Sequence, residues 1–455
     1  MESSHIISIT NGEENNNNIA HMKKEKTTQF PLPPIVSHHG KNKIHSSFVP
    51  ITSYLKDNKE IKNECDIKKM IHCIKVGISL VLVSLLYILN PLFDQVGENA
   101  MWAIMTVVVI FESSAGATLG KGINRGIGTI VGGGIGCLAA ILAQNIGGVG
   151  NSIFIATSVY IIGSMATYFR LVPKIKNRYD YGVVVFMLTF NLVVVSGSRP
   201  GVKVWEVARE RLLTILMGFI VCICVSLFVF PMWASDELHY SILSTFQDLA
   251  NTIQGCLEEC SKSVKEKENQ ADASFTICKS VLNSKSKDES LANFAKWEPW
   301  HGKFGFSYPW EKYLKIGEVL RELAALILAL ESCIRASKKP TSCWKSSKTV
   351  QFEQCEAIGS RLVWTLREIG DNMKQMKKCE EVDSIMAKLK STREELSLVI
   401  STSMIAEFEN GEVLAIASLV FLLMEVVEKV EELVKEVKEL GDMARFRTRV
   451  TSESS

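Results

Sequence analysis

The chain has 455 residues, enough for two units of ordinary size, and a formal net charge of +2. This average conceals segregated charges, because residues 71–233 are strongly apolar whereas the region after residue 233 is rich in Lys and Glu. The mean composition is therefore not that of an ordinary globular protein. The near-neutral net charge gives no reason to expect a nucleic-acid partner, and we expect none.

The first part of the chain predicts a tail followed by a membrane domain. Residues 1–66 hold a run of Asn and few large apolar side chains, so we expect them to be disordered. Residues 67–233 contain six apolar segments that predict transmembrane helices. These segments are 71–89, 100–114, 127–146, 153–169, 181–196 and 212–233. The second is the shortest, and we expect a half-buried helix that continues through the glycine-rich link 113–122 as a broken helix.

The distribution of basic residues predicts the orientation of these segments. Lys and Arg gather before the first segment, where Lys75 is counted as a flanking charge, and in the links after the second and fourth segments. The stretches 91–99 and 147–152 carry none, and only the link after the fifth segment, with Arg199 and Lys203, breaks this asymmetry. By the positive-inside rule, both termini are expected to be cytosolic.

A stripe of small residues marks the third segment. Gly128, Gly132, Gly136 and Ala140 recur every four residues, so they share one face of a helix. Such a face lets another helix backbone approach closely, and we favour this packing role over a gating hinge. The pattern leaves open whether the neighbour belongs to the same subunit or to a partner subunit.

The region 234–445 predicts a cytosolic helical bundle, and residues 446–455 a flexible end. Amphipathic helices are predicted over 235–266, 311–337, 352–378, 382–409 and 411–440. The last contains an apolar stripe from Val426 to Val437 and is interpreted as a core helix. Residues 283–291 and 297–310 are predicted loops. The second loop is aromatic, and we favour a packing role for its rings over ligand stacking.

No pattern of the chain predicts catalysis or metal binding. The 12 cysteines include no Cys-x-x-Cys pair, and no nucleophile motif or metal-ligand spacing is present. The glycine-rich run 132–136 lies inside an apolar segment, which is the wrong context for a phosphate-binding loop. We therefore expect no metal, no cofactor and no enzymatic activity.

Three cations beside the apolar segments are candidates for an anion path. Arg125 follows Lys121 by one helical turn and precedes the third segment. From position alone, Arg125 reads as an ordinary flanking charge at the headgroups. Arg211 opens the sixth segment in a charged turn with Glu206 and Glu210, and it fits either a pore-facing role or a juxtamembrane salt-bridge cluster.

Four motifs closely resemble the aluminium-activated malate transporter family of plants. They are Asn-Ala-Met-Trp-Ala-Ile-Met-Thr-Val-Val-Val at 99–109, Gly-Ala-Thr-Leu-Gly-Lys-Gly-Ile-Asn-Arg-Gly at 116–126, Tyr-Asp-Tyr-Gly at 179–182, and Trp297-Glu298-Pro299. The resemblance runs from about residue 71 to about residue 446. It implies an all-α fold with six membrane helices followed by a cytosolic helical domain.

The resemblance also implies a function. Members are anion channels that pass malate and related anions, are built as homodimers in a lipid bilayer, and reside in the plasma membrane or the vacuolar membrane. For this chain the plasma membrane is slightly favoured. Arg125 and Arg211 match family positions expected to supply the positive charge of the pore, which reverses the flanking interpretation of Arg125, and Lys121 is grouped with them.

The resemblance further suggests how some members sense aluminium. Acidic residues on the outer side are linked to this response, and Asp94 and Glu206 occupy such places. Val202 stands where another acid is expected, so this chain departs from the pattern of responsive members.

Two alternatives to a channel remain at this stage. An ion-coupled organic-acid exporter could use the same helices, but it should need a protonatable carboxylate at the centre of a span, and Glu112 lies at an end. A membrane-anchored scaffold would need fewer spans and no flanking arginines.

Overall fold

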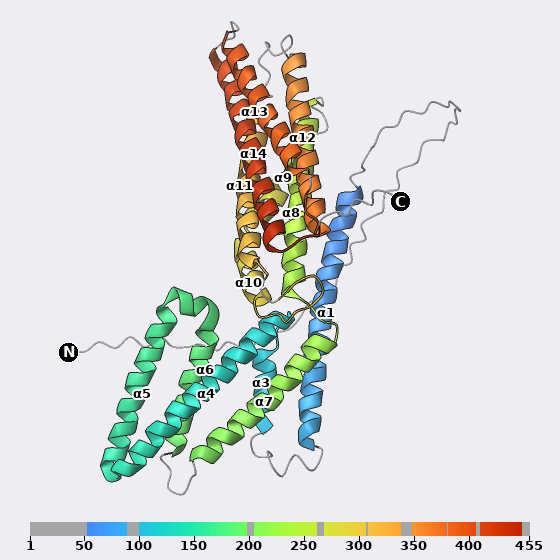
Figure 1. The fold of residues 1–455 in the computed structure, drawn as a ribbon. Coiled ribbons are helices and arrows are strands. Elements are labelled where there is room, and N and C mark those ends of the chain that lie inside the picture. Colours follow the sequence, from blue (N-terminus) through green and yellow to red (C-terminus); the bar gives the residue numbers. More distant parts are fainter. Residues whose placement is uncertain are drawn as a thin grey trace, which may run out of the picture. The chain divides into compact units, whose positions relative to one another are not determined.

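The computed structural model describes residues 52–88, 100–197, 204–261, 268–305, 308–337, 348–379, 381–405 and 410–447. Every regular element in these ranges is an α-helix, which confirms the all-α prediction (Figure 1). Asp94 and Val202, named in the sequence predictions, lie outside the described residues, as do most of the predicted tail and the predicted flexible end.

In the described part of the chain, the apolar helices come first. They are α1 (Thr52–Ile88), α3 (Ala100–Ile110), α4 (Ala115–Ile146), α5 (Gly148–Leu171), α6 (Pro173–Gly197) and α7 (Val204–Phe228). All except α3 contain segments long and apolar enough to cross a membrane, and α3 has the shorter apolar stretch Met101–Ile110. At about 1.5 Å per residue, α3 rises roughly half of the ~30 Å hydrocarbon thickness. The predicted count of six spans therefore depends on α3.

The start of α4 differs from the sequence prediction. The helix begins at Ala115, so most of the residues of the predicted glycine-rich link 113–122 form the first turns of α4. Ser114 explains the position, because its side chain accepts a hydrogen bond from Ala117 N at 3.3 Å and thereby caps the helix. As a result, Lys121 and Arg125 are helical residues and not link residues.

The glycine stripe of α4 packs against α6 of the same chain. A Cβ atom added at Gly132 would lie 2.6 Å from the carbonyl oxygen of Phe186, and one added at Gly136 would lie 3.0 Å from Val193 Cβ. A Cβ at Gly128 would overlap the carbonyl oxygen of Gly182. Only glycine permits this approach of two helix backbones, so the packing interpretation of the stripe applies within one chain.

The apolar helices expose much of their apolar surface. On α5, the side chains of Val149, Tyr160 and Leu171 are 74–78% exposed, and Ala166 is its buried residue. Patches of this kind are costly in water and ordinary against hydrocarbon. The packing of these helices therefore suits a lipid environment.

The helices after residue 233 form a second group, here called the C-terminal bundle. It comprises α8 (Ala234–Ser261), α9 (Glu268–Leu282), α10 (Lys285–Ala295), α11 (Trp310–Ser337), α12 (Lys348–Lys374), α13 (Val382–Ile405) and α14 (Asn410–Met443), with the long helices side by side (Figure 1). Leu238, Ile316, Leu366 and Val430 are fully buried in one apolar core. The stripe of α14 lies in this core, which confirms its interpretation as a core helix.

The prediction of a loop at residues 283–291 is wrong, because the residues from Lys285 onward form α10. The segment is polar, so its sequence shows little apolar periodicity. Tertiary contacts stabilise it instead, since Leu291 and Ala292 enter the core and buried Asp288 pairs with Arg321 at 3.0 Å. Short helices generally depend on such packing more than on propensity.

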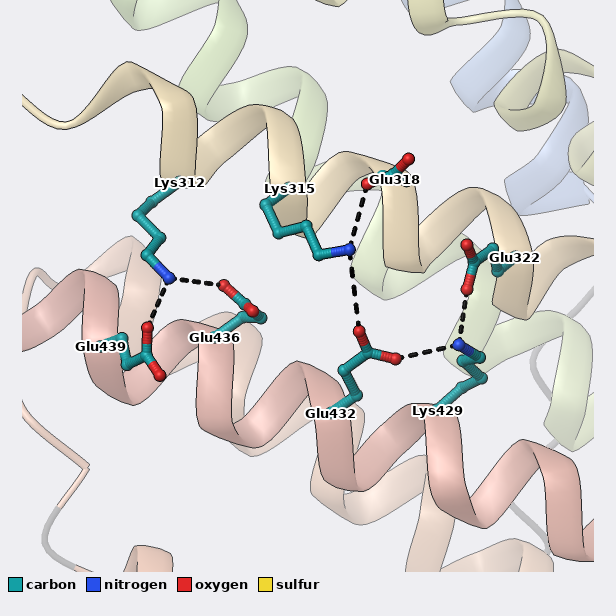
Figure 2. Close-up of polar contacts among 8 residues, drawn as sticks. All are labelled: Lys312, Lys315, Glu318, Glu322, Lys429, Glu432, Glu436 and Glu439. Atoms are coloured by element: carbon teal, nitrogen blue, oxygen red, sulfur yellow. Dashed lines mark hydrogen bonds and ion pairs between the residues drawn. The ribbon is translucent and has the colours of Figure 1, made fainter.

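Ion pairs join α11 and α14 along their length, as Figure 2 shows. Lys312 of α11 bonds to Glu436 at 3.0 Å and to Glu439, while Lys429 of α14 bonds to Glu322 of α11 at 2.6 Å and to Glu432 of its own helix at 2.9 Å. Residue numbers rise on one helix as they fall on the other, so the pair is antiparallel. Each half-exposed pair contributes at most about 1 kcal/mol, so the network serves mainly to define the register of the helices.

A buried histidine should make folding sensitive to pH. His239 is 2% exposed, and its Nδ1 lies 2.8 Å from the Tyr313 hydroxyl. Burial, together with the charge of Lys303, lowers the pKa of His239 to about 4. The unfolded chain therefore binds a proton before the folded chain does. Stability contributed by neutral His239 is present above pH ~6.5 and is lost as the pH falls towards about 4.

We expect this loss to be about 3 kcal/mol in the free energy of unfolding. Thermal unfolding of the detergent-purified protein between about pH 7 and about pH 4.5 would measure most of it, about 2 kcal/mol. His239→Phe should lose this part of the pH dependence and retain the part that is due to carboxylates. Equal pH dependence in the two proteins would contradict the prediction.

Candidate functional site

Arg125 is a buried cation at the contact between α4 and α6. It is 6% exposed, and its Nη1 donates a hydrogen bond to the Tyr181 hydroxyl at 3.0 Å. The preceding residue strengthens the same contact, because Asn124 Nδ2 donates to the carbonyl oxygen of Arg178 at 3.0 Å. The orientation of Arg125 is therefore determined by α6 as well as by its own helix.

The guanidinium of Arg125 is incompletely satisfied within the described residues. Its Nε is buried without a hydrogen-bond partner, and no carboxylate there forms an ion pair with it. A buried cation without a counter-charge is costly, so such a residue needs water or a mobile anion nearby. Arg125 therefore retains hydrogen-bond donors that are free to meet water or an anion.

Arg211 lies half-buried on α7 and contacts α3. Its guanidinium carbon is 4.4 Å from the centre of the Trp102 ring, a cation–π distance. Among the residues that the structure describes, no carboxylate is ion-paired with Arg211. The salt-bridge cluster considered from the sequence does not include Arg211, whose charge stays available to an anion.

Lys121 differs from the two arginines because its charge is already compensated. It forms an ion pair with Glu112, which follows the end of α3. Thr118 holds Glu112 in place by hydrogen bonds to its backbone nitrogen at 3.1 Å and its carbonyl oxygen at 3.4 Å. Lys121 is thus the weakest of the three predicted pore cations on geometric grounds.

Arg125 and Arg211 lie on neighbouring helices at different heights. Gly122 of α4 faces Phe219 of α7, and the Ala115 nitrogen donates a hydrogen bond to the carbonyl oxygen of Met232, which lies beyond the end of α7, so α4 and α7 are antiparallel. This register separates the two arginine positions by about five residues of α7, or roughly 8 Å along the axis. The structure thus brings them to the same helix pair without direct contact.

Lys75 on α1 is a buried cation and not the flanking charge that the sequence pattern predicts. It is 1% exposed, although the sequence pattern treats it as a flanking charge. The signal for a different role was its position inside the first apolar segment, four residues after Ile71. Within the described residues it has no carboxylate partner, so it resembles Arg125 in this respect.

The residues predicted to sense a cation are not brought together in the described structure. Glu206 is exposed in the first turn of α7, and Asp94 lies outside the described residues. No group of three or more His, Cys, Asp or Glu residues suited to a metal occurs in the ranges that the structure describes. Aluminium sensing by these two acids stays a prediction.

The family motif Trp297-Glu298-Pro299 is a structural junction. Glu298 is 7% exposed and accepts hydrogen bonds from Ala234 N at 2.6 Å and from the Ser235 hydroxyl at 2.6 Å. Burial raises the pKa of this carboxyl above its ordinary value. The rings that follow, including buried Phe304 and Trp310, pack on one another, as expected of a packing loop.

Apolar helices of membrane-spanning length with buried cations define a multi-pass membrane protein. A family model described as "Aluminium activated malate transporter" matches residues 62–407. The chain therefore belongs to the aluminium-activated malate transporter family, which makes it a transport protein and not an enzyme.

Individual relatives agree with this assignment. The chain is 36% identical over 411 residues to aluminum-activated malate transporter 2 of Arabidopsis thaliana, covering 89% of this chain and 81% of the relative. It is 33% identical over 431 residues to transporter 7 of the same plant, covering 88% and 84%. A protein of Triticum aestivum, aluminum-activated malate transporter 1, is 41% identical over 286 residues, covering 61% of each chain.

Proposed function

We propose that this protein is a plant anion channel that passes malate, and smaller inorganic anions, passively through a membrane. The observation that carries the proposal is the buried guanidinium of Arg125, which has a free Nε and no carboxylate partner in the described residues. The channel is proposed to act as a homodimer in the lipid bilayer, with residues 67–233 forming the pore domain and the C-terminal bundle in the cytosol. The plasma membrane is slightly favoured over the vacuolar membrane.

Arginine suits this task for two chemical reasons. Its planar guanidinium can meet a carboxylate with two parallel hydrogen bonds, and it stays charged at any cellular pH. At Arg125 one donor is used by Tyr181, which holds the group in place and leaves its other donors for a solute. Arg211 adds a second cation further along the path, and Lys75 a third within the same helix group.

The membrane potential is sufficient to drive malate without a coupled ion. Moving a divalent anion through about 100 mV changes its free energy by about 4.6 kcal/mol, twice the value for a single charge. Binding at each cation must stay weak enough for the anion to leave. The water or anion contact that Arg125 requires is compatible with such transient binding.

The alternative is an ion-coupled exporter on the same scaffold. A carrier of this kind commonly uses a buried protonatable carboxylate. The buried polar residues of the described apolar helices are hydroxyl residues, Asn124, Lys75 and Arg125. Two acids near helix ends, Glu112 and Asp180, are paired with Lys121 and Arg170, and Glu206 and Glu210 lie in the first two turns of α7. This inventory favours a channel.

Recordings from purified protein in planar bilayers would test the proposal. We expect malate currents whose reversal potential follows the malate gradient and does not move when a pH gradient is imposed at constant ionised malate. Proton-dependent shifts of the reversal potential would indicate the exporter. Failure of malate, nitrate and chloride to carry any current would indicate a scaffold, and the mass of the purified particle would test the dimer.

A further inference from the structure

The loop around Trp297 contacts the membrane helices and the C-terminal bundle at the same time. On the bundle side, Glu298 binds the free backbone N–H groups at the start of α8, at 2.6 Å from Ala234 N and 3.2 Å from Ser235 N. His301 stacks on Trp233 with 3.8 Å between ring centres, and its Nε2 lies 2.9 Å from the Ser235 hydroxyl. The loop is therefore firmly attached to the start of α8.

On the membrane side, the half-buried ring of Trp297 lies against α4 and α6. A Cβ atom added at Gly120 would be 2.9 Å from Trp297 Cδ1, so the ring rests on the bare backbone of α4. The Arg178 guanidinium of α6 lies 5.0 Å from the centre of the same ring. One side chain thus contacts the two helices whose meeting point holds Arg125.

The path from this ring to Arg125 is short and continuous. Gly120 precedes Arg125 by less than two turns of α4. The carbonyl oxygen of Arg178 accepts the hydrogen bond from Asn124, and Tyr181, one turn further along α6, bonds to Arg125 itself. Any displacement of Trp297 would alter the relative position of α4 and α6 at the level of Arg125.

We propose that Trp297 is a positioning residue that couples the C-terminal bundle to Arg125 and thereby controls how often the anion path opens. The proposal rests on the proposed function as a channel. A flat ring on a glycine surface permits small sliding of packed helices, which is a known mode of conformational change. The firm attachment by Glu298 ensures that movement of α8 is passed to the ring.

A double-mutant cycle between Gly120 and Trp297 tests this coupling. In single-channel recordings, Trp297→Ala should lower the open probability at a fixed voltage by about fivefold or more, the lower range of ordinary coupling between sites. Gly120→Ala should also change the open probability, because its methyl group displaces the ring. In the double variant the methyl group has room, so Gly120→Ala should add nothing further.

The control is Trp300→Ala in the same loop, since that ring is 71% exposed and should leave the open probability unchanged. Trp297→Phe keeps an aromatic ring on Gly120 and should restore most of the activity if Trp297→Ala folds poorly. The malate-to-chloride permeability ratio and the single-channel conductance should stay at wild-type values in every folded variant. A merely local structural defect would lower surface expression and leave the open probability of the surviving channels unchanged.

Three results would overturn the inference. These are wild-type gating in Trp297→Ala, additive effects of the two substitutions, and an altered permeability ratio, which would place Trp297 in the pore itself. Absence of malate current in the wild-type protein would be a separate result, since it would reject the proposed channel and not the junction.

Discussion

Arg125→Glu channels are expected to reach the membrane and to carry almost no malate current. At an effective dielectric constant of about 20, one unit charge about 5 Å away contributes roughly 3 kcal/mol per charge of the anion. Since 1.4 kcal/mol is a factor of ten, reversal of this charge should lower the malate current by at least about 100-fold. The Tyr181 hydroxyl can donate to the new carboxylate, so local packing need not collapse.

Milder substitutions separate charge from geometry. Arg125→Lys should retain anion current but weaken malate relative to chloride, because an ammonium lacks the planar two-pronged contact. The malate current of Arg125→Gln should lie between the currents of Arg125→Lys and Arg125→Glu. Malate and chloride currents in excised patches, normalised to surface protein, would rank the three variants. Normal malate current in surface-expressed Arg125→Glu channels would show that Arg125 is a flanking charge and not part of the pore.

Arg211 provides the corresponding test near the start of α7. Arg211→Glu should also suppress malate current, although the effect should be smaller because the residue is less buried than Arg125. Arg209 is the matched control, since it carries the same charge two residues earlier but is exposed. Arg209→Glu should leave the current within about twofold of wild type, as expected for a screened surface charge. Equal losses in the two variants would mean that only the general surface potential matters.

Gly132→Leu should abolish current through loss of folding, and not through loss of pore charge. Its first added atom would lie 2.6 Å from the Phe186 carbonyl oxygen and 3.2 Å from Phe190 N, both on the backbone of α6. A backbone cannot rotate away as a side chain can, so the whole helix must move. Overpacking of this kind costs about 1–3 kcal/mol or more, enough to remove much of the stability of an ordinary protein.

Gly134 on the same helix is the control for Gly132. A Cβ at Gly134 meets nothing within 4 Å, so Gly134→Leu should behave like the wild type. Fluorescence-detected size-exclusion chromatography should show a single peak for Gly134→Leu and aggregated or degraded material for Gly132→Leu. If both variants give wild-type peaks and currents, the contact between α4 and α6 is looser than the structure indicates.

The apolar segments, the all-α class and the family could be predicted from the sequence because each depends on local pattern. Runs of apolar residues indicate helices that can enter a membrane, and a glycine every four residues indicates a helix face for close packing. The stripe of α14 was predicted in the same way and lies in the core. The motifs around Trp102, Arg125 and Trp297 carried the family assignment.

Other features depend on residues distant in sequence, which local patterns do not encode. Arg125 and Tyr181 are 56 positions apart, and Glu298 and Ala234 are 64 apart. Only the folded chain shows that Arg125 retains a free donor whereas Lys121 is neutralised by Glu112. The polar helix α10 was missed for the same reason, since its stability comes from burial against other helices.

The sequence by itself determined where the apolar helices lie, which cations accompany them, and which family the chain belongs to. The tertiary structure decided which cations keep an unpaired charge, that the glycine stripe faces α6 of the same chain, and that Trp297 contacts both α4 and α6. The physical reason is that helix formation and apolar character follow from neighbouring residues. Charge compensation and backbone contact instead depend on distances that arise only when remote segments pack together.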